Sequence, residues 1–228
     1  MEPGSVLREA WGLYKAHWRH FIPIALVFYL ALSLLTLVLT LALGWLGALA
    51  SVFVSLAGVF WLQGALVEAV QDVRDGRADL SIVETFRRVG PRFASLAGAG
   101  LLASLGIVFG LVLLIVPGLF LATIWSLIVP VIVLEGRAAM ESFSRSRELV
   151  RGHAWNVFGV IVLTFVILFA TGIVLSLVLS ALPDSLQGYL QNVISGAITA
   201  PFAALAWTLM YYRLAERQAS AAASPVLA

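Results

Sequence analysis

The sequence predicts an all-α membrane protein that crosses the bilayer several times, and both its composition and its patterning indicate this class. Apolar residues make up 61% of the 228 residues and charged residues only 11%, whereas a soluble domain has about 45–50% apolar and about 25% charged residues. The apolar residues gather in runs of about 20, the length that a helix needs to cross a bilayer. Charged residues fill the short intervals between these runs. We therefore expect a polytopic helical domain.

The predicted domain occupies residues 1–213 and begins with an amphipathic interfacial helix over residues 5–20. One face of this helix carries Trp11, Tyr14 and Trp18 and the other carries cations, a pattern typical of helices in the headgroup layer. Ser5 is suited to its N-cap. Six spans follow, at about residues 21–43, 46–70, 93–116, 119–134, 154–182 and 189–213. Residues 214–228, rich in alanine and serine, predict a disordered cytoplasmic tail.

Turn signals pair the six spans into three hairpins. Residues 44–47 predict a tight turn after the first span, and Pro117-Gly118 predicts one after the third. Ser81 and Glu84 fit a capping box that opens a short helix before the third span. Pro130 is expected to bend the last turn of the fourth span, because proline cannot donate a helical hydrogen bond.

The charge distribution predicts the topology. Six spans place the termini and the loops at 72–92 and 135–153 on one side of the membrane, and all fourteen Lys and Arg residues lie there. The other side receives short turns with a single charge, Asp184. The positive-inside rule then predicts that both termini are cytoplasmic. The preference for arginine, alanine, leucine, glycine and valine is typical of GC-rich bacterial genomes, so we expect a bacterial cytoplasmic (inner) membrane.

A short polar segment precedes each hairpin and holds an acid, a small residue and an aromatic residue, at residues 9–11, 84–86 and 141–143. Basic residues follow in each case. The recurrence predicts a threefold unit of surface helix plus hairpin; the alternative is that every interfacial helix needs these residue types. Glu84 with Arg88, and Glu141 with Arg145, have the i,i+4 spacing of helical ion pairs.

The longest polar interval in the second half of the chain is the loop at residues 135–153. It separates two apolar runs and carries three closely spaced arginines. We interpret it as a helix at the membrane surface. The arginines expected to contact lipid headgroups or a partner protein are Arg145, Arg147 and Arg151, with Arg87, Arg88 and Arg92 beside them. Charges of alternating sign and a net charge of +2 favour solvated loops over nucleic-acid binding. The expected partners are therefore membrane lipids, a partner protein or a second copy, and no nucleic acid.

Polar residues within the spans are few. The candidate buried polar residues are Gln63, Glu68, Ser126 and Asn192; such groups either bond between helices as packing contacts or line a pocket. Glu68 lies near the end of its span, where we expect an ion pair with a loop arginine. Gly106 and Gly110 form a G-x-x-x-G motif that serves either packing within the chain or a homodimer face.

The chain carries no recognisable catalytic motif. It has no cysteine, no G-x-S-x-G, no H-E-x-x-H and no phosphate-binding loop. His17 and His20 stand three apart, which suits either a metal or an interfacial helix; we favour the interfacial interpretation. We therefore predict that the protein is not an enzyme and that it binds neither a cofactor nor a metal.

Residues 117–160 carry a family resemblance. Pro117-Gly118, Pro130, Glu135-Gly136, the run from Ser144 to Ser146, and Trp155 make the chain resemble the membrane domain of bacterial glycerophosphoryl diester phosphodiesterases and related uncharacterised six-span inner-membrane proteins. The resemblance extends over about residues 60–213. It implies a membrane module without hydrolase chemistry, because in the two-domain members that chemistry belongs to a soluble barrel with no counterpart in these residues.

Two functions are open on this basis. The first is a non-enzymatic membrane module that organises lipid or a partner protein at the cytoplasmic face. The second is a small permease or flippase for an apolar or amphipathic substrate, which would need a cavity lined by residues such as Gln63, Ser126 and Asn192.

Overall fold

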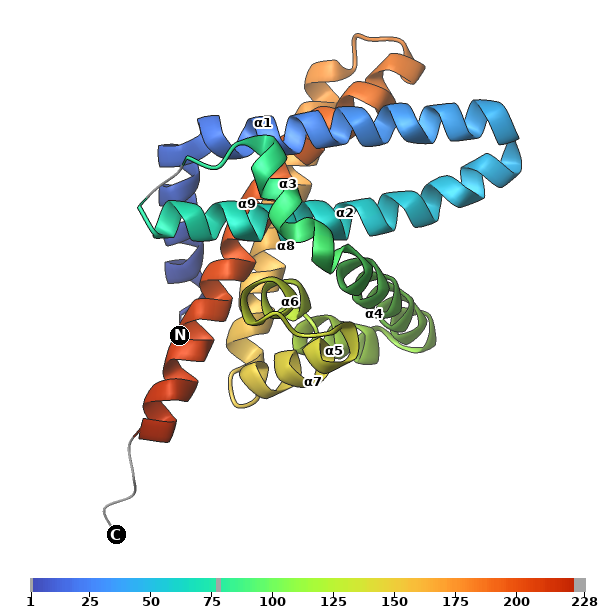
Figure 1. Cartoon of the computed structure of the whole chain (residues 1–228). Coiled ribbons are helices and arrows are strands. Elements are labelled where there is room, and N and C mark those ends of the chain that lie inside the picture. Colours follow the sequence, from blue (N-terminus) through green and yellow to red (C-terminus); the bar gives the residue numbers. More distant parts are fainter. Residues whose placement is uncertain (1, 77–78, 224–228) are drawn as a thin grey trace.

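The computed structural model describes residues 2–76 and 79–223, and these are almost entirely helical (Figure 1). Six helical segments are long and apolar enough to cross a membrane, and the described residues include no strand. This confirms the predicted fold class, an all-α polytopic membrane protein. The six segments coincide with the predicted spans and differ from them mainly at their ends.

The first hairpin consists of α1 (Pro3–Leu43) and α2 (Trp45–Arg74). Gly44 joins the two helices with a φ of 56°, a left-handed conformation that glycine adopts without strain. The turn is confirmed at Gly44, but it is shorter than predicted because residues 45–47 already belong to α2. The α1 backbone leaves helical geometry at His17, where φ is −124° and ψ is 23°. A short N-terminal segment is therefore set off from the apolar part of the helix.

This N-terminal segment packs against α9 of the same chain. Val6, Ala10 and Tyr14 are buried, and the Tyr14 hydroxyl donates a hydrogen bond of 3.1 Å to the carbonyl of Ile198. Its apolar face therefore covers protein, while Trp11 and Trp18 remain about half exposed. Because the helix already begins at Pro3, the predicted N-cap role of Ser5 is wrong.

The second hairpin begins with a polar helix and contains an interrupted span. Its elements are α3 (Ile82–Val89), the 3-10 turn η1 (Gly90–Arg92), α4 (Phe93–Leu113), α5 (Ile115–Ile124) and α6 (Ile128–Glu135). The backbone N–H of Glu84 donates to Ser81 Oγ at 3.2 Å, which confirms Ser81 as the N-cap, while the Glu84 carboxylate pairs with Arg87 instead of completing the capping box. The turn between α4 and α5 lies at Leu114, earlier than predicted, because Pro117 fits the first turn of α5, where no N–H is needed.

The fourth span is not one helix. α5 ends at Ile124 and α6 begins at Ile128, with a non-helical turn at residues 125–127. Pro130 lies in the first turn of α6. The expectation that Pro130 bends the last turn of this span is therefore wrong, since the interruption precedes the proline.

The third hairpin is preceded by α7 (Ala139–Val150) and consists of α8 (Ala154–Leu179) and α9 (Asp184–Ala223). Residues 214–223 continue α9, so the predicted disordered tail is wrong there, while residues 224–228 lie outside the described residues. Leu214 is buried and Gln218 bonds to α7. These contacts hold the end of α9 against the protein.

The three hairpins share a core near the chain termini and diverge toward their tips (Figure 1). Phe21, Leu66 and Met210 are fully buried in this core. At the tips, Leu41 is 77% exposed and Val178 is 70% exposed. Exposed apolar side chains at the tips suit contact with acyl chains, so the hairpins meet at one end and separate in the lipid.

The G-x-x-x-G motif packs α4 against α5. A Cβ at Gly106 would lie 2.7 Å from the Trp125 ring, and one at Gly110 would lie 2.9 Å from the Cα of Gly118. The motif therefore brings two backbones together within the chain. Gly110 is buried against α5, and Gly106 is half-buried beneath the Trp125 ring, so the motif serves packing within the chain.

Candidate functional site

The interruption of the fourth span is closed by Ser146 of α7. Its hydroxyl donates to the carbonyl of Ile124 at 2.7 Å and accepts from the backbone N–H of Leu127 at 3.2 Å. Ser146 is fully buried, so it satisfies two backbone groups that the broken helix leaves without helical partners. This pair of bonds fixes α7 against the junction of α5 and α6.

A second anchor of α7 is the carboxylate of Glu135, at the end of α6. Arg145 Nε lies 3.0 Å from both carboxylate oxygens, Arg137 Nε lies 2.9 Å from Oε2, and the Tyr211 hydroxyl donates to Oε1 at 3.0 Å. The hydrogen bond to Glu135 raises the pKa of Arg137. The carboxylate thus joins α6, α7 and α9 at one point.

Arg145 continues this network toward α9. Its Nη1 donates to Gln218 Oε1 at 2.8 Å and lies 3.4 Å from Glu148 Oε2. The predicted i,i+4 pair of Glu141 with Arg145 is therefore not formed. Gly136 adopts a φ of 69° just after α6, and the chain reversal that it allows brings α7 back toward Glu135.

With α7 fixed in this way, its outer face borders a groove between α5 and α8. The groove consists of two adjoining hollows of about 590 Å³ and about 330 Å³, which share Phe120 and Ala154. The first hollow is bordered by Arg147 and Arg151. The second is almost entirely apolar and includes Trp155 and Phe158. The groove is therefore cationic at one end and apolar at the other.

The two arginines at the cationic end have no partner within the described residues. Within the described residues, the side chains of Arg147 and Arg151 make no ion pair, hydrogen bond or ring contact, whereas every other described Lys or Arg side chain makes at least one. Glu148 also borders this end, and it lies within 3.4 Å of Arg145. α8 begins here at Ala154 without a side-chain N-cap bond. The first-turn N–H groups of a helix favour an anion.

The other predicted contact arginines are engaged within the chain. Arg87 lies 2.7 Å and Arg88 3.6 Å from Glu84, so the predicted Glu84–Arg88 pair is confirmed. Arg92 lies 3.4 Å from Glu68, which confirms the expected pairing of Glu68 with a loop arginine. The structure therefore singles out Arg147 and Arg151 among the six arginines.

The predicted buried polar residues do not converge on one pocket. Ser126 donates to the carbonyl of Thr123 at 2.9 Å, and Glu68 faces Arg92. Gln63 is half-buried in α2 and Asn192 is exposed on α9. Asn192 alone among these four borders a hollow described below.

Comparison with known proteins places this arrangement in a family. The family model of a domain of unknown function, DUF7847, matches residues 16–216. The chain belongs to the DUF7847 family. No curated protein and no solved structure matches it. The matched region contains α2 to α8 and most of α1 and α9, so the groove and the residues that contact Glu135 lie inside the DUF7847 domain, while Gln218 lies just beyond it.

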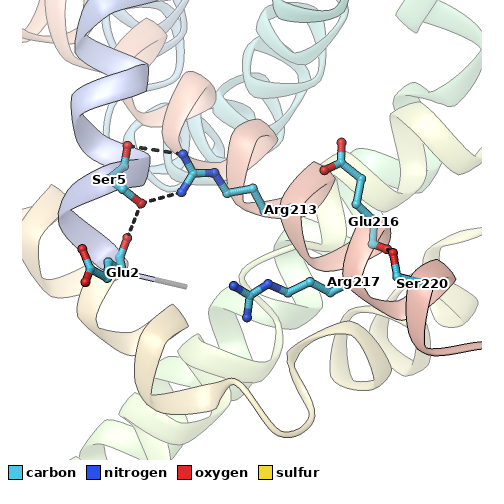
Figure 2. Close-up of a pocket in the computed structure, with 6 residues that line it drawn as sticks. All are labelled: Glu2, Ser5, Arg213, Glu216, Arg217 and Ser220. Carbon is cyan, nitrogen blue, oxygen red and sulfur yellow. Dashed lines mark hydrogen bonds between the residues drawn. The ribbon is translucent and has the colours of Figure 1, made fainter. Parts of the chain in front are cut away.

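A more polar hollow of about 610 Å³ lies between the two ends of this DUF7847 protein (Figure 2). Here Arg213 donates to Ser5 Oγ at 2.6 Å and also pairs with Glu9. Arg217 lies 3.4 Å from Nε2 of His153. Both arginines have partners, so we interpret this hollow as the joint between the start of α1 and the end of α9.

Sequence reasoning missed the residues that position α7. Ser146 was one of several serines in a polar helix, and Tyr211 was part of an apolar span. Their partners lie far along the chain, at Ile124 and Glu135. No local pattern distinguished them.

Proposed function

We propose that this protein is a non-enzymatic membrane module that binds an anionic phospholipid in the groove between α5, α7 and α8. Arg147 and Arg151 bind the headgroup phosphate, and the apolar hollow beyond them holds the start of an acyl chain. The observation that carries the proposal is the absence of any internal partner for these two arginines within the described residues, at the mouth of an apolar groove.

The cationic end and the apolar end of the groove match the headgroup and the acyl chain of an anionic lipid. Guanidinium groups form strong, charge-assisted hydrogen bonds with phosphate oxygens, and the start of α8 adds a favourable dipole. Phe120, Trp155 and Phe158 supply the apolar wall. Trp155 is 85% exposed, which suits an aromatic side chain at the level of lipid headgroups.

One serine borders the groove, and it has no adjacent base within the described residues. Ser144 borders the cationic end, and within the described residues its hydroxyl makes no hydrogen bond to a histidine or a carboxylate. A serine without an adjacent base is a weak nucleophile. The function that we propose for the groove is therefore lipid retention.

The orientation belongs to the same proposal. We infer that the groove faces the side of the membrane that holds both termini, because α7 and the start of α8 border it and belong to that side in the predicted topology. Basic residues concentrate there, and the positive-inside rule assigns such a side to the cytoplasm. We therefore place the bound lipid in the cytoplasmic leaflet of a bacterial inner membrane.

Quenching of Trp155 by brominated acyl chains tests the proposal. Wild type and Trp155→Phe are reconstituted into phosphatidylcholine vesicles that contain either brominated phosphatidylglycerol or brominated phosphatidylcholine at the same fraction. The difference between the two proteins isolates the Trp155 signal. We expect brominated phosphatidylglycerol to quench the Trp155 fluorescence more strongly than brominated phosphatidylcholine does.

The variants make the test specific. Arg147→Ala/Arg151→Ala is expected to abolish the preference for phosphatidylglycerol, while Arg87→Ala/Arg88→Ala, which removes the same charge elsewhere, is expected to retain it. Equal quenching of Trp155 by both lipids in the wild type would refute the proposal.

A further inference from the structure

A second groove lies between the α1–α2 hairpin and α9, and it shares no lining residue with the groove at α7. Its volume is about 380 Å³, within the range of about 300–1,000 Å³ that is typical of ligand sites. The polar residues that line it with free side-chain groups are Tyr29, Ser33, Ser55, Tyr189 and Asn192. Its lining residues belong to three candidate spans, with Tyr189 and Asn192 in the first turns of α9.

These five side chains make no hydrogen bond within the described residues. Two neighbouring threonines behave differently: Thr36 donates to the Ser33 carbonyl at 3.0 Å and Thr40 to the Thr36 carbonyl at 2.8 Å. Hydroxyl and amide groups that bond to nothing in the chain remain available to donate to or accept from a ligand. Five such groups around one groove therefore indicate a polar ligand.

The position of Tyr29 is fixed by packing. Its ring lies so close to Gly196 that a Cβ there would come within 2.4 Å of Cζ. Tyr29 therefore rests against the α9 backbone at a residue that has no side chain. The hydroxyl is held in place before any ligand binds, which lowers the entropic cost of binding.

The lining residues define the class of ligand. None of the groove-lining residues is charged, so neither a phosphate nor an ammonium group finds a counter-ion there. Hydroxyl and amide groups donate and accept hydrogen bonds, as a polyol requires. Leu32, Leu37 and Val59 complete the wall, and these apolar residues suit an alkyl segment beside the polar group.

We propose that this groove binds an uncharged, hydroxyl-rich group, supplied by the sugar headgroup of a neutral glycolipid or by a free sugar. The site differs from the cavity expected for a permease, because Gln63 and Ser126 do not line it. It is also independent of Arg147 and Arg151, so each proposal stands or falls alone.

Native mass spectrometry of the full chain tests this proposal. The protein is kept in lauryldimethylamine oxide, since a sugar-based detergent would compete. Monoglucosyl diacylglycerol is titrated in parallel with diacylglycerol that has the same acyl chains, and free glucose is added as a competitor. We expect the wild type to retain the glucolipid at one copy per chain and to retain diacylglycerol more weakly.

The variant Tyr29→Phe/Tyr189→Phe removes two hydroxyls and keeps the shape of the groove. We expect about tenfold weaker glucolipid binding, since each hydrogen bond contributes a factor of several. Its thermal stability should stay at the wild-type value because both hydroxyls lack partners within the chain. Tyr212→Phe is the matched control: it removes a hydroxyl outside the groove and should bind normally.

Competition by glucose would identify a free sugar as the source, and its failure to compete would identify the glycolipid; both results support the hydroxyl-rich ligand. Equal retention of glucolipid and diacylglycerol by the wild type would overturn the proposed site. Glucolipid binding at the wild-type level by the Tyr29→Phe/Tyr189→Phe variant would also overturn it.

Discussion

The hydroxyl of Ser146 lies 2.7 Å from the carbonyl oxygen of Ile124 and donates a hydrogen bond to it. This bond joins a polar helix, α7, to the point where the fourth apolar span is broken. A break in a membrane helix exposes backbone groups that water cannot satisfy, and protein groups must replace the lost bonds. The position of α7, and with it the direction of Arg147 and Arg151, depends on this contact.

Replacement of Ser146 by alanine is expected to destabilise the protein. The Ile124 carbonyl and the Leu127 N–H would both lose a buried partner, a loss that costs about 1–3 kcal/mol. Thermal unfolding in detergent micelles measures the effect. Ser144→Ala, at an exposed position of the same helix, is the control and should stay close to the wild type. Equal stability of the two variants would show that the bonds to Ser146 do not close the break.

The Glu135–Arg145 pair should couple strongly in a double-mutant cycle. With Glu135→Gln, Arg145→Met and the double variant, we expect a coupling free energy of about 1–2 kcal/mol, within the range for residues of one network. The pair is largely shielded, with 17% and 22% of the side chains exposed. The exposed pair Glu84–Arg87 should give a smaller coupling, roughly 0.2–1 kcal/mol. If the two couplings are the same, the carboxylate of Glu135 is not the anchor of α7.

Gly110 and Gly98 lie on the same helix and should respond oppositely to alanine. A Cβ at Gly110 meets the backbone of Gly118 at 2.9 Å, whereas one at Gly98 meets nothing within 4 Å. Gly110→Ala should therefore lower the free energy of unfolding by about 1–3 kcal/mol through overpacking. Gly98→Ala should be neutral or stabilising by up to about 1 kcal/mol, from its higher helix propensity. Similar thermal stability of both variants would contradict the close contact of α4 with α5.

Several features could be predicted from the sequence because their causes are local. Apolar runs of sufficient length define the six spans whatever their packing. Gly44 marks the first turn because glycine accepts a positive φ. Ser81 caps α3 because its hydroxyl needs only the N–H of Glu84, three residues further on. In each case the cause lies within one element or one turn.

Other features depended on distant contacts. Residues 125–127 contain neither glycine nor proline, and the hydrogen bonds that close the break come from a serine in another helix. Spacing alone favoured Glu141 as the partner of Arg145, but the chain reversal at Gly136 brings Glu135 closer. Residues 214–223 were predicted to be disordered by composition, although alanine is the strongest helix former and Gln218 has a partner in α7.

We propose that Arg147 and Arg151 hold the phosphate of an anionic lipid. The most direct measurement is native mass spectrometry of the full chain titrated with phosphatidylglycerol, for the wild type and two double variants. We expect one phosphatidylglycerol per chain in the wild type and in Arg87→Ala/Arg88→Ala, and about tenfold weaker retention in Arg147→Ala/Arg151→Ala, because charge-assisted hydrogen bonds are lost. If both double variants retain the lipid as well as the wild type does, the two arginines are not its binding site.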